Sequence, residues 1–370
     1  MEWADVNALR VQVLGAAFAV SIFFGWVVQR SQFCTMGAIN DWLSMGDRTR
    51  FQVWMAAIST ASLGLWAMHA MGWVDPRQSI YASERVLVLS ALVGGAFFGF
   101  GMVLASGCGS KTLVRMGTGS LKALTVFVVM GVAAYATLRG ITGVLRDRTL
   151  DQVFWSTDSS LLPVWLAGSW GGSPASWGLG MAAALAVVVW AWAARNPDFW
   201  QAHHLWGALG IGGSVIAMWW VSGALGFVSE HPASLQPEFI ATNSHRMESL
   251  TFTAPMAYTL HWLILFSDSA NVLTLAVVSV AGVVVGAFVS AALQGSLRWE
   301  GFQGTQDTAL HLVGATCMGF GGVTAMGCTV GQGLSGMSTL SVTSVLAMLG
   351  IVGGAVLGLK FQIWLLMRDD

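Results

Sequence analysis

Charged side chains are scarce in this 370-residue chain. Only 9% of its residues are Asp, Glu, Lys or Arg, whereas a soluble domain carries about 25%. Hydrophobic residues make up 55% of the chain, and the mean hydropathy is +0.67. So few charges cannot cover the surface of a water-soluble protein of this length. The composition therefore excludes a chain of soluble domains and indicates a protein whose main solvent is lipid.

Proline and cysteine are also scarce, with seven and four residues, and the formal net charge is only −1. The near-neutral charge excludes a polybasic nucleic-acid binder. Few prolines together with long apolar runs exclude a disordered chain. The chain contains no HExxH, G-x-S-x-G or Walker pattern. We therefore predict a protein that is not an enzyme, has no cofactor and contacts a lipid bilayer rather than nucleic acid.

Long apolar stretches dominate what is present. A helix needs about 20 apolar residues to cross the hydrocarbon of a membrane. Nine stretches reach or approach that length: 9–28, 51–71, 85–105, 123–138, 177–194, 205–227, 272–293, 308–325 and 340–366. The first stretch follows Glu2 and Asp5 instead of a basic segment, so we expect a retained span and not a signal peptide.

Four further apolar segments are too short to cross, namely 33–45, 109–117, 253–266 and 329–336. Segments of this length fit re-entrant half-helices, which are tolerated where they are buried in protein or line a cavity. The predicted fold is an all-α polytopic membrane protein with about nine transmembrane helices and four short re-entrant half-helices.

An internal repeat divides the chain. Residues 93–108 (VGGAFFGFGMVLASGC) and 313–328 (VGATCMGFGGVTAMGC) are identical at nine of 16 positions, with a constant offset of 220. We predict a first repeat over 1–145, an outer loop and linking span over 146–200, and a second repeat over 201–370. Four spans on each side of one linking span make the repeats inverted, which is a recurrent plan of transporters.

Basic residues favour one orientation of this bundle. The face that carries the C-terminus collects ten of the 17 Lys and Arg residues, and the other face collects seven. The positive-inside rule then predicts a cytoplasmic C-terminus and an N-terminus outside.

Three of the four cysteines lie at predicted helix breaks. Cys34 starts a short segment, and Cys108 and Cys328 close the two copies of the repeat. Cysteine often serves only as a small hydrophobe, but three at equivalent breaks favour a pathway lined by thiols. Cys317 lies within a span, and we expect it to serve packing. The thiols are too widely spaced, and too far from any histidine, for a zinc site, so we predict no metal.

Cations follow only the first of the two repeated cysteines. Lys111 and Arg115 come shortly after Cys108, whereas Gly331 and Ser335 stand at the matching places after Cys328. The alternative to an anion-attracting role for Lys111 and Arg115 is an ordinary positively charged loop.

The segments around these cysteines carry a resemblance. The sequences SQFCTMGA (31–38), GCGS (107–110) and GCTVGQG (327–333) resemble those of the YeeE/YedE family of sulfur-transport membrane proteins. The resemblance implies nine spanning and four short helices in inverted halves, and uptake of thiosulfate across a bacterial inner membrane. It also implies three pathway cysteines, Cys34, Cys108 and Cys328, and a cytosolic sulfur carrier resembling TusA as a partner. The chain departs from the family at Lys111 and Arg115 and in an extended loop over 139–160.

Thiol chemistry suits a small sulfur-containing anion. Protonated thiols offer weak S–H donors, and weak multiple sites let an ion enter and also leave. The backbone of Gly107 and Gly327, next to two of the thiols, is expected to line the path. Two other functions stay open: a passive pore for a small neutral solute and a membrane thiol oxidoreductase.

Overall fold

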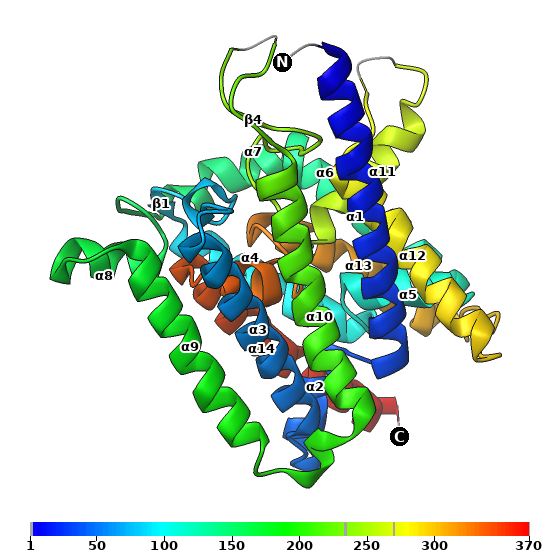
Figure 1. The fold of residues 1–370 in the computed structure, drawn as a ribbon. Helices are drawn as coiled ribbons and strands as arrows, with labels where there is room; N and C mark the ends of the chain where they lie inside the picture. Colours follow the sequence, from blue (N-terminus) through cyan, green and yellow to red (C-terminus); the bar gives the residue numbers. More distant parts are fainter. Residues whose placement is uncertain (1–2, 233–234, 269–270, 370) are drawn as a thin grey trace.

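The computed structural model describes residues 3–232, 235–268 and 271–369, and these residues are mostly helical (Figure 1). The α-helices are α1 (Trp3–Ser31), α2 (Thr35–Met45), α3 (Thr49–Ala70), α4 (Val88–Leu104), α5 (Gly109–Gly117), α6 (Leu121–Arg139), α7 (Ile141–Arg148), α8 (Leu162–Trp170), α9 (Pro174–Ala193), α10 (Ala202–Trp220), α11 (Thr253–Ile264), α12 (Leu275–Leu293), α13 (Thr305–Thr324) and α14 (Val342–Asp369). Short 3₁₀ and π turns complete the helical part: η1 (Pro76–Gln78), η2 (Leu150–Gln152), η3 (Pro197–Trp200), η4 (Val221–Leu225) and η5 (Gly331–Gly336).

Strands are confined to two antiparallel pairs of two residues per strand. β1 (Arg85–Val86) pairs with β2 (Trp155–Ser156), with Arg85 opposite Ser156. β3 (Phe227–Val228) pairs with β4 (Glu238–Phe239), with Phe227 opposite Phe239. Both pairs lie among the loops at one end of the bundle, the end at the top of Figure 1.

Eight helical stretches of the described chain are long and apolar enough to cross a membrane, and the fold is that of an all-α polytopic membrane protein. Eight of the nine stretches predicted from the sequence correspond to this set. The ninth, 308–325, forms helix α13, which has 20 residues but falls outside the set. Its Gly and Thr residues, together with Asp307 and His311, lower its hydropathy.

Glycines bring α4 and α13 into close and reciprocal contact. A Cβ at Gly94 would lie 2.5 Å from the Ala325 nitrogen, and a Cβ at Gly314 would lie 2.7 Å from the Ala105 nitrogen. These two contacts are equivalents at the repeat offset of 220. Only residues without a side chain allow backbones to approach so closely, as is common between helices in lipid.

The same contacts fix the relative direction of the two helices. Gly94, early in α4, meets the end of α13, whereas Gly101, late in α4, meets Gly314 in the middle of α13. The repeat-equivalent helices are therefore antiparallel. An axis that relates two antiparallel helices is perpendicular to them, as inverted repeats require.

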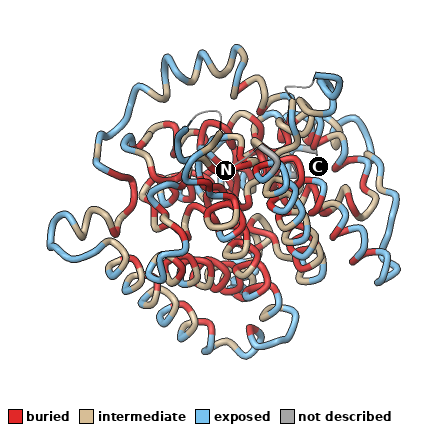
Figure 2. Tube along the Cα trace, turned by 45° about the horizontal axis from the view of Figure 1, so that its top comes forward, coloured by how far each residue is buried: buried red, intermediate tan, exposed pale blue. Residues whose placement is uncertain are grey.

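Other helix contacts also occur in pairs, and each contact joins a helix of one half of the chain to a helix of the other half. α1 packs along α12 and α10 along α3, while α4 packs along α14 and α13 along α6. α9 packs on the outside of α3, and in the chain it lies between helices α1–α8 and helices α10–α14 (Figure 1). Buried segments gather in the central helices (Figure 2), whereas only four residues of α9 are buried.

All four predicted short segments are short helices. They are α2, α5, α11 and η5, the last of which is a π-helix. The extended loop predicted over 139–160 contains the short elements α7, η2 and β2, which the sequence did not predict. Helix α8 was also missed; it starts with Pro163 in its first turn and is only nine residues long.

Candidate functional site

Cys34 and Cys108 directly precede the short helices α2 and α5, and Cys328 lies three residues before η5. The Cys34 thiol accepts the Gly37 N–H at 3.4 Å, and the Cys328 thiol accepts the Gly331 N–H at 3.4 Å. The Cys108 thiol makes no such capping hydrogen bond to α5. The Cys34 thiol thus takes the place of the usual hydroxyl or carboxylate cap of α2. All three cysteines are between 0% and 6% exposed.

The fold brings these three cysteines together from distant parts of the chain. The Cys108 thiol interacts with the Cys34 thiol and with the Thr329 hydroxyl, and lies 3.3 Å from Ser110 Oγ. Cys328 lies within electrostatic range of Cys108. The three side chains therefore form one buried group, which we call the thiol cluster.

Cys317, for which the sequence predicts a packing role, lies elsewhere. It is half-buried at the crossing of α4 and α13. Its Cβ lies 2.8 Å from the position that a Cβ would take at Gly101. Cys317 takes no part in the interactions described above for the thiol cluster. It therefore provides a matched control for the other three cysteines.

Tight bends precede Cys108 and Cys328. Ser106 has φ +56° and Met326 has φ +59°, and these two residues are equivalent in the repeat. This left-handed conformation is uncommon for residues other than glycine. The bends end α4 and α13 and turn the chain toward the short helices, which is how the repeat places a thiol at each break.

Lys111 and Gln332 occupy corresponding places beside the glycines that follow these bends. A Cβ at Gly107 would lie 3.0 Å from Lys111 Cδ, and a Cβ at Gly327 would lie 3.1 Å from Gln332 Cγ. The constant offset of 220 matches Lys111 to Gly331. In space, however, the side chain that corresponds to Lys111 is that of Gln332. One half presents a cation where the other presents a neutral amide.

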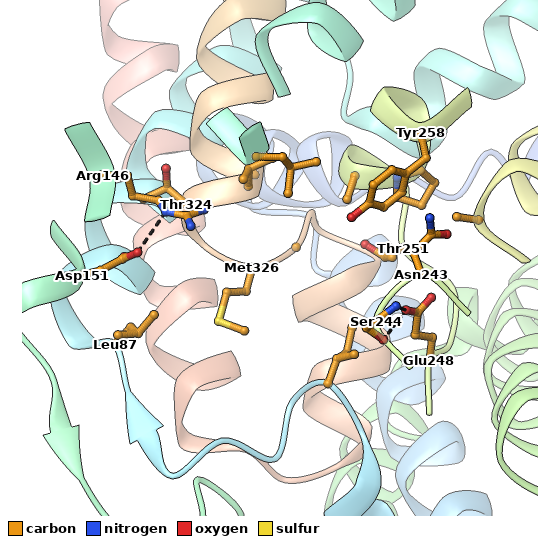
Figure 3. A pocket seen from close by; sticks show the side chains of 18 residues that line it. Leu87, Arg146, Asp151, Asn243, Ser244, Glu248, Thr251, Tyr258, Thr324 and Met326 are labelled. Carbon is orange, nitrogen blue, oxygen red and sulfur yellow. Dashed lines mark hydrogen bonds and ion pairs between the residues drawn. The ribbon is translucent and has the colours of Figure 1, made fainter. Parts of the chain in front are cut away.

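A cavity of about 370 Å³ is lined in part by Met326 and Gly327, the two residues before Cys328 (Figure 3). Thr251, Tyr258 and Glu248 line it, together with the Arg146–Asp151 ion pair at 3.0 Å, and Gly327 forms part of its wall. We call this cavity the vestibule. Burial raises the pKa of Glu248, and its carboxylate accepts the Ser244 N–H at 3.0 Å. Apart from Gly327, sequence analysis did not find these residues, and only the length of the polar segments 139–160 and 228–250 could have drawn attention to Arg146, Asp151 and Glu248.

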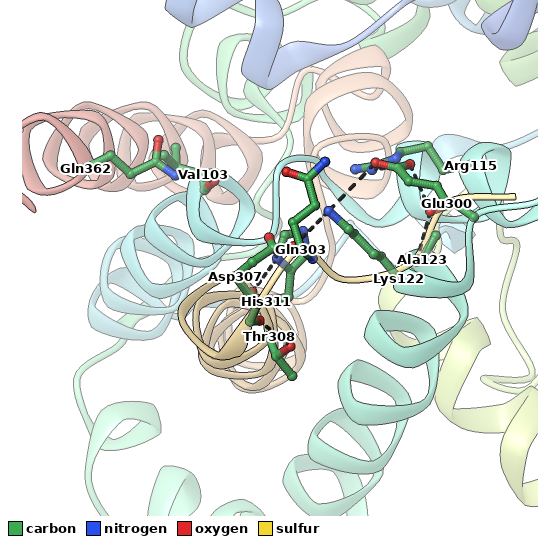
Figure 4. Close-up of polar contacts among 12 residues, drawn as sticks. Val103, Arg115, Lys122, Ala123, Glu300, Gln303, Asp307, Thr308, His311 and Gln362 are labelled. Carbon is green, nitrogen blue, oxygen red and sulfur yellow. Dashed lines mark hydrogen bonds and ion pairs between the residues drawn. The ribbon is translucent and has the colours of Figure 1, made fainter. Parts of the chain in front are cut away.

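An ion-pair cluster lies at the other end of α5 (Figure 4). Arg115 binds Glu300 at 2.9 Å, and Lys122 binds Asp307 at 2.8 Å and Glu300 at 3.8 Å. The hydrogen bond from the Arg115 guanidinium lowers the pKa of Glu300. Arg115 is thus engaged in holding the loop before α13 against α5 and α6.

Lys111 differs from Arg115 in this respect. Among the described residues, no carboxylate lies within 4.0 Å of the Lys111 ammonium. Lys111 lies within electrostatic range of Cys34. Of the two cations singled out in the sequence, Lys111 is the one that the structure places beside the thiol cluster.

No group of three or more His, Cys, Asp or Glu side chains that could hold a metal ion occurs in the described part of the chain. The four cysteines are free thiols. The site offers thiols, backbone N–H groups and one lysine, a set suited to reversible contact with a small anion that contains sulfur.

Known proteins resemble this chain over most of its length. It is 26% identical to the thiosulfate transporter TsuA of Spirochaeta thermophila over 362 residues, which cover 94% of this chain and 98% of that protein. It is also 26% identical to the thiosulfate transporter TsuA of Escherichia coli K12 over 321 residues, covering 84% and 83%. The probable transporter YedE of Escherichia coli K12 matches 113 residues at 28% identity, or 30% of this chain and 26% of that protein.

The family model for sulphur transport matches residues 30–357, a range that contains all three cysteines of the thiol cluster. This agrees with the resemblance carried by the cysteine segments. The chain therefore belongs to the sulphur-transport family, which includes the YeeE/YedE proteins.

Proposed function

We propose that this protein imports thiosulfate, or a closely related sulfur-containing anion, across the bacterial inner membrane. The observation that carries the proposal is the thiol cluster, where Cys34, Cys108 and Cys328 meet from distant parts of the chain and where Cys328 directly follows Gly327 of the vestibule wall. The similarity to two thiosulfate transporters supports the same substrate class. The proposed role is transport and not catalysis.

The chemistry of the thiol cluster fits this substrate. Thiosulfate is a dianion with one polarisable terminal sulfur, and a charge in bare hydrocarbon is very costly. Protonated thiols donate weak hydrogen bonds that can be made and broken in turn. The N-terminal ends of α2 and α5 add partial positive charge next to Cys34 and Cys108. Weak contacts of this kind offset the charge without trapping the ion.

The order of contacts gives the proposed path. The anion enters the vestibule, passes Gly327 to Cys328, moves to Cys108 and then to Cys34, and leaves past Lys111. In this proposal Gly107 and Gly327 contribute backbone to the path. In this proposal Arg115 does not contact the ion. It holds the loop before α13 in place through its ion pair with Glu300.

The two ends of the path would come from the two repeats. We infer that residues 1–145 and 201–370 are inverted copies joined by 146–200, and the reciprocal contacts of α4 and α13 support this division. The vestibule would face outside, as would the N-terminus, and the C-terminus would be cytoplasmic. A cytosolic sulfur carrier resembling TusA would then receive the product at the face that carries Lys111 and Arg115.

One observation favours a second candidate, a membrane thiol oxidoreductase. The sequence contains no C-x-x-C pair, but the fold places the thiols of Cys34 and Cys108 in contact. An oxidoreductase would cycle a disulfide between these two residues during turnover. A transporter would keep them as thiols, which mass spectrometry of alkylated protein after uptake would show.

A host that cannot take up thiosulfate provides the direct test. Expression of this protein should restore growth on thiosulfate as the sole sulfur source. Cys108→Ala and Cys328→Ala should each abolish most of the uptake, and so should the Cys→Ser changes, because serine lacks the polarisable sulfur.

Cys317→Ala is the matched control, and it should retain uptake because Cys317 lies outside the thiol cluster. Full uptake by a Cys108→Ala, Cys328→Ala double variant at normal expression would end the proposal of a thiol path. Uptake retained in the serine variants but lost in the alanine variants would show instead that only a hydrogen-bond donor is needed.

A further inference from the structure

Two buried hydroxyl groups beside the thiol cluster have no conventional hydrogen-bond partner. They are Tyr81 Oη and Thr329 Oγ1, on side chains of residues that are 4% and 0% exposed. Thr329 follows Cys328 in the chain, and its hydroxyl makes only the weak contact with the Cys108 thiol. Tyr81 Oη lies 3.5 Å from the position that a Cβ would take at Gly331, whose N–H binds the Cys328 thiol.

Several neighbouring buried hydroxyls are paired, although Ser79 Oγ and Thr253 Oγ1 are unpaired like those of Tyr81 and Thr329. Ser335 donates to the Leu250 carbonyl at 2.7 Å, Thr339 to the Gly336 carbonyl at 2.7 Å, and Ser344 to Gln332 at 2.6 Å. An unpaired buried donor costs folding free energy, so natural proteins seldom keep one without a function. Both unpaired hydroxyls lie next to thiols that the proposed substrate would contact.

The rest of Tyr81 is held firmly while its hydroxyl is left unpaired. Its backbone carbonyl accepts hydrogen bonds from Ser160 at 2.6 Å and from Ser341 at 3.3 Å. Its ring packs edge-on against Trp219, with 6.1 Å between ring centroids, and Trp219 in turn donates to Ser338 at 3.0 Å. A fixed ring with an unpaired donor is the arrangement expected of a preorganised ligand contact.

We propose that Tyr81 and Thr329 form an oxyanion-binding site between Cys328 and Cys108, in which their hydroxyls donate to the oxygens of a sulfur oxyanion while the thiols contact its terminal sulfur. This inference rests on the proposed function and adds the groups that recognise the oxygen end of the substrate. The site belongs to one half only, because the repeat equivalent of Thr329 is Gly109, which has no hydroxyl. The two ends of thiosulfate are then recognised by different chemistry, which selects an anion that carries both oxygens and soft sulfur.

Thermal unfolding of the purified protein, with and without added anion, tests the site. Without anion, Tyr81→Phe should unfold at the same temperature as the wild type or higher, because it removes only an unpaired hydroxyl. With thiosulfate, the stabilisation by ligand should shrink, corresponding to a Kd roughly tenfold higher, as expected for one lost hydrogen bond to a charged group. Thr329→Val should weaken binding in the same way, and Thr329→Ser, which keeps the hydroxyl, should restore it.

Tyr135→Phe is the control, since Tyr135 is half-buried on α6 and stacks on His261 with 5.2 Å between ring centroids. It should leave anion binding unchanged. Wild-type affinity in both Tyr81→Phe and Thr329→Val would overturn the proposal. So would a large fall in the unfolding temperature of Tyr81→Phe without anion, because that would assign the hydroxyl a structural role.

Sulfite and sulfate, tested in parallel, separate this inference from the proposed substrate. If the wild type binds sulfite or sulfate but not thiosulfate, and Tyr81→Phe weakens that binding, the oxyanion site stands and the thiosulfate proposal fails. If thiosulfate binds the wild type and both variants equally, the substrate stands and the oxyanion site fails. If none of the three anions binds the wild type, both proposals fail.

Discussion

Lys111 places a positive charge beside the thiol cluster in one half of the molecule only. Its ammonium lies within electrostatic range of Cys34 and has no carboxylate partner in the part of the chain that the structure describes, whereas its counterpart Gln332 donates to the Ala325 carbonyl at 2.6 Å. A cation without a carboxylate partner, next to the exit of the proposed path, attracts an anion, and the attraction weakens as salt rises.

Lys111→Gln should therefore lower the apparent affinity for thiosulfate at low ionic strength. Loss of about 1 kcal/mol of attraction corresponds to a roughly fivefold higher KM, and the variant should depend less on salt than the wild type does. Uptake into proteoliposomes over a range of thiosulfate and salt concentrations measures both effects. Lys360→Gln, on the exposed side of α14, is the matched control. Equal KM values and equal salt dependence in Lys111→Gln and the wild type would contradict an anion-attracting role.

The crossing of α4 and α13 is the element contact on which the symmetry of the bundle depends. A Cβ at Gly94 or at Gly314 would lie 2.5 Å or 2.7 Å from a backbone nitrogen of the other helix. Backbone atoms cannot move aside as the end of a flexible side chain can, so the helices would have to separate.

Gly94→Ala and Gly314→Ala should each destabilise the protein, by about 1–3 kcal/mol as for other overpacked cores. Because the two contacts are equivalent, their effects should be similar in size. Gly353→Ala on α14 is the control: a Cβ there meets nothing within 4 Å, and alanine favours a helix. Thermal unfolding in detergent measures all three, and an unchanged unfolding temperature in both crossing variants would contradict this account.

The ion-pair cluster at the end of α5 gives the loop before α13 a dependence on pH. The Arg115 guanidinium lowers the pKa of Glu300 in the folded protein. The folded state therefore binds a proton less readily there than the unfolded state does. The stabilisation from this pair is present above the unfolded pKa of Glu300 and is lost as pH falls through its lower folded value.

Glu300→Gln should accordingly flatten the loss of stability between about pH 5 and pH 3, the range in which an ordinary Glu begins to titrate and a lowered one completes its titration. Unfolding temperatures measured across that range for the wild type and the variant provide the test. Glu84→Gln, an exposed change on the loop before β1, should keep the wild-type profile. A variant profile with the same slope as the wild type would show that the Arg115–Glu300 pair contributes nothing to this dependence.

The whole molecule has two ends of different character. One end carries the N-terminus, the strand pairs and the vestibule, and the other carries the C-terminus (Figure 1). The excess of basic residues on the C-terminal side predicts that this side is cytoplasmic. A green fluorescent protein fused to the C-terminus should then fluoresce in intact bacteria, and an alkaline phosphatase fused there should be inactive. The reverse result would invert the proposed direction of the path.

Sequence alone determined the features that depend on local composition. Apolar length predicted the spans, and breaks in it predicted the four short helices α2, α5, α11 and η5. The constant offset of 220 predicted that Cys108 and Cys328 take equivalent positions at helix breaks, as they do. These features follow from sequence because the cost of placing polar groups in lipid acts on each segment separately. Helices α7 and α8 were missed because short helices outside the apolar runs carry no such signal.

Tertiary structure alone decided which residues meet. Cys34 and Cys108 are 74 positions apart and Arg115 and Glu300 are 185 apart, so no local pattern could show that the first pair interact or that Arg115 is already neutralised. Likewise, Tyr81 lies in a loop whose sequence gives no reason to place its hydroxyl beside Cys328. Contacts between distant segments depend on how the helices cross, and the close approach of glycines in α4 and α13 sets that crossing. Sequence therefore specified the helices and the thiols, and only packing brought the thiols, the unpaired hydroxyls and Lys111 together into one site.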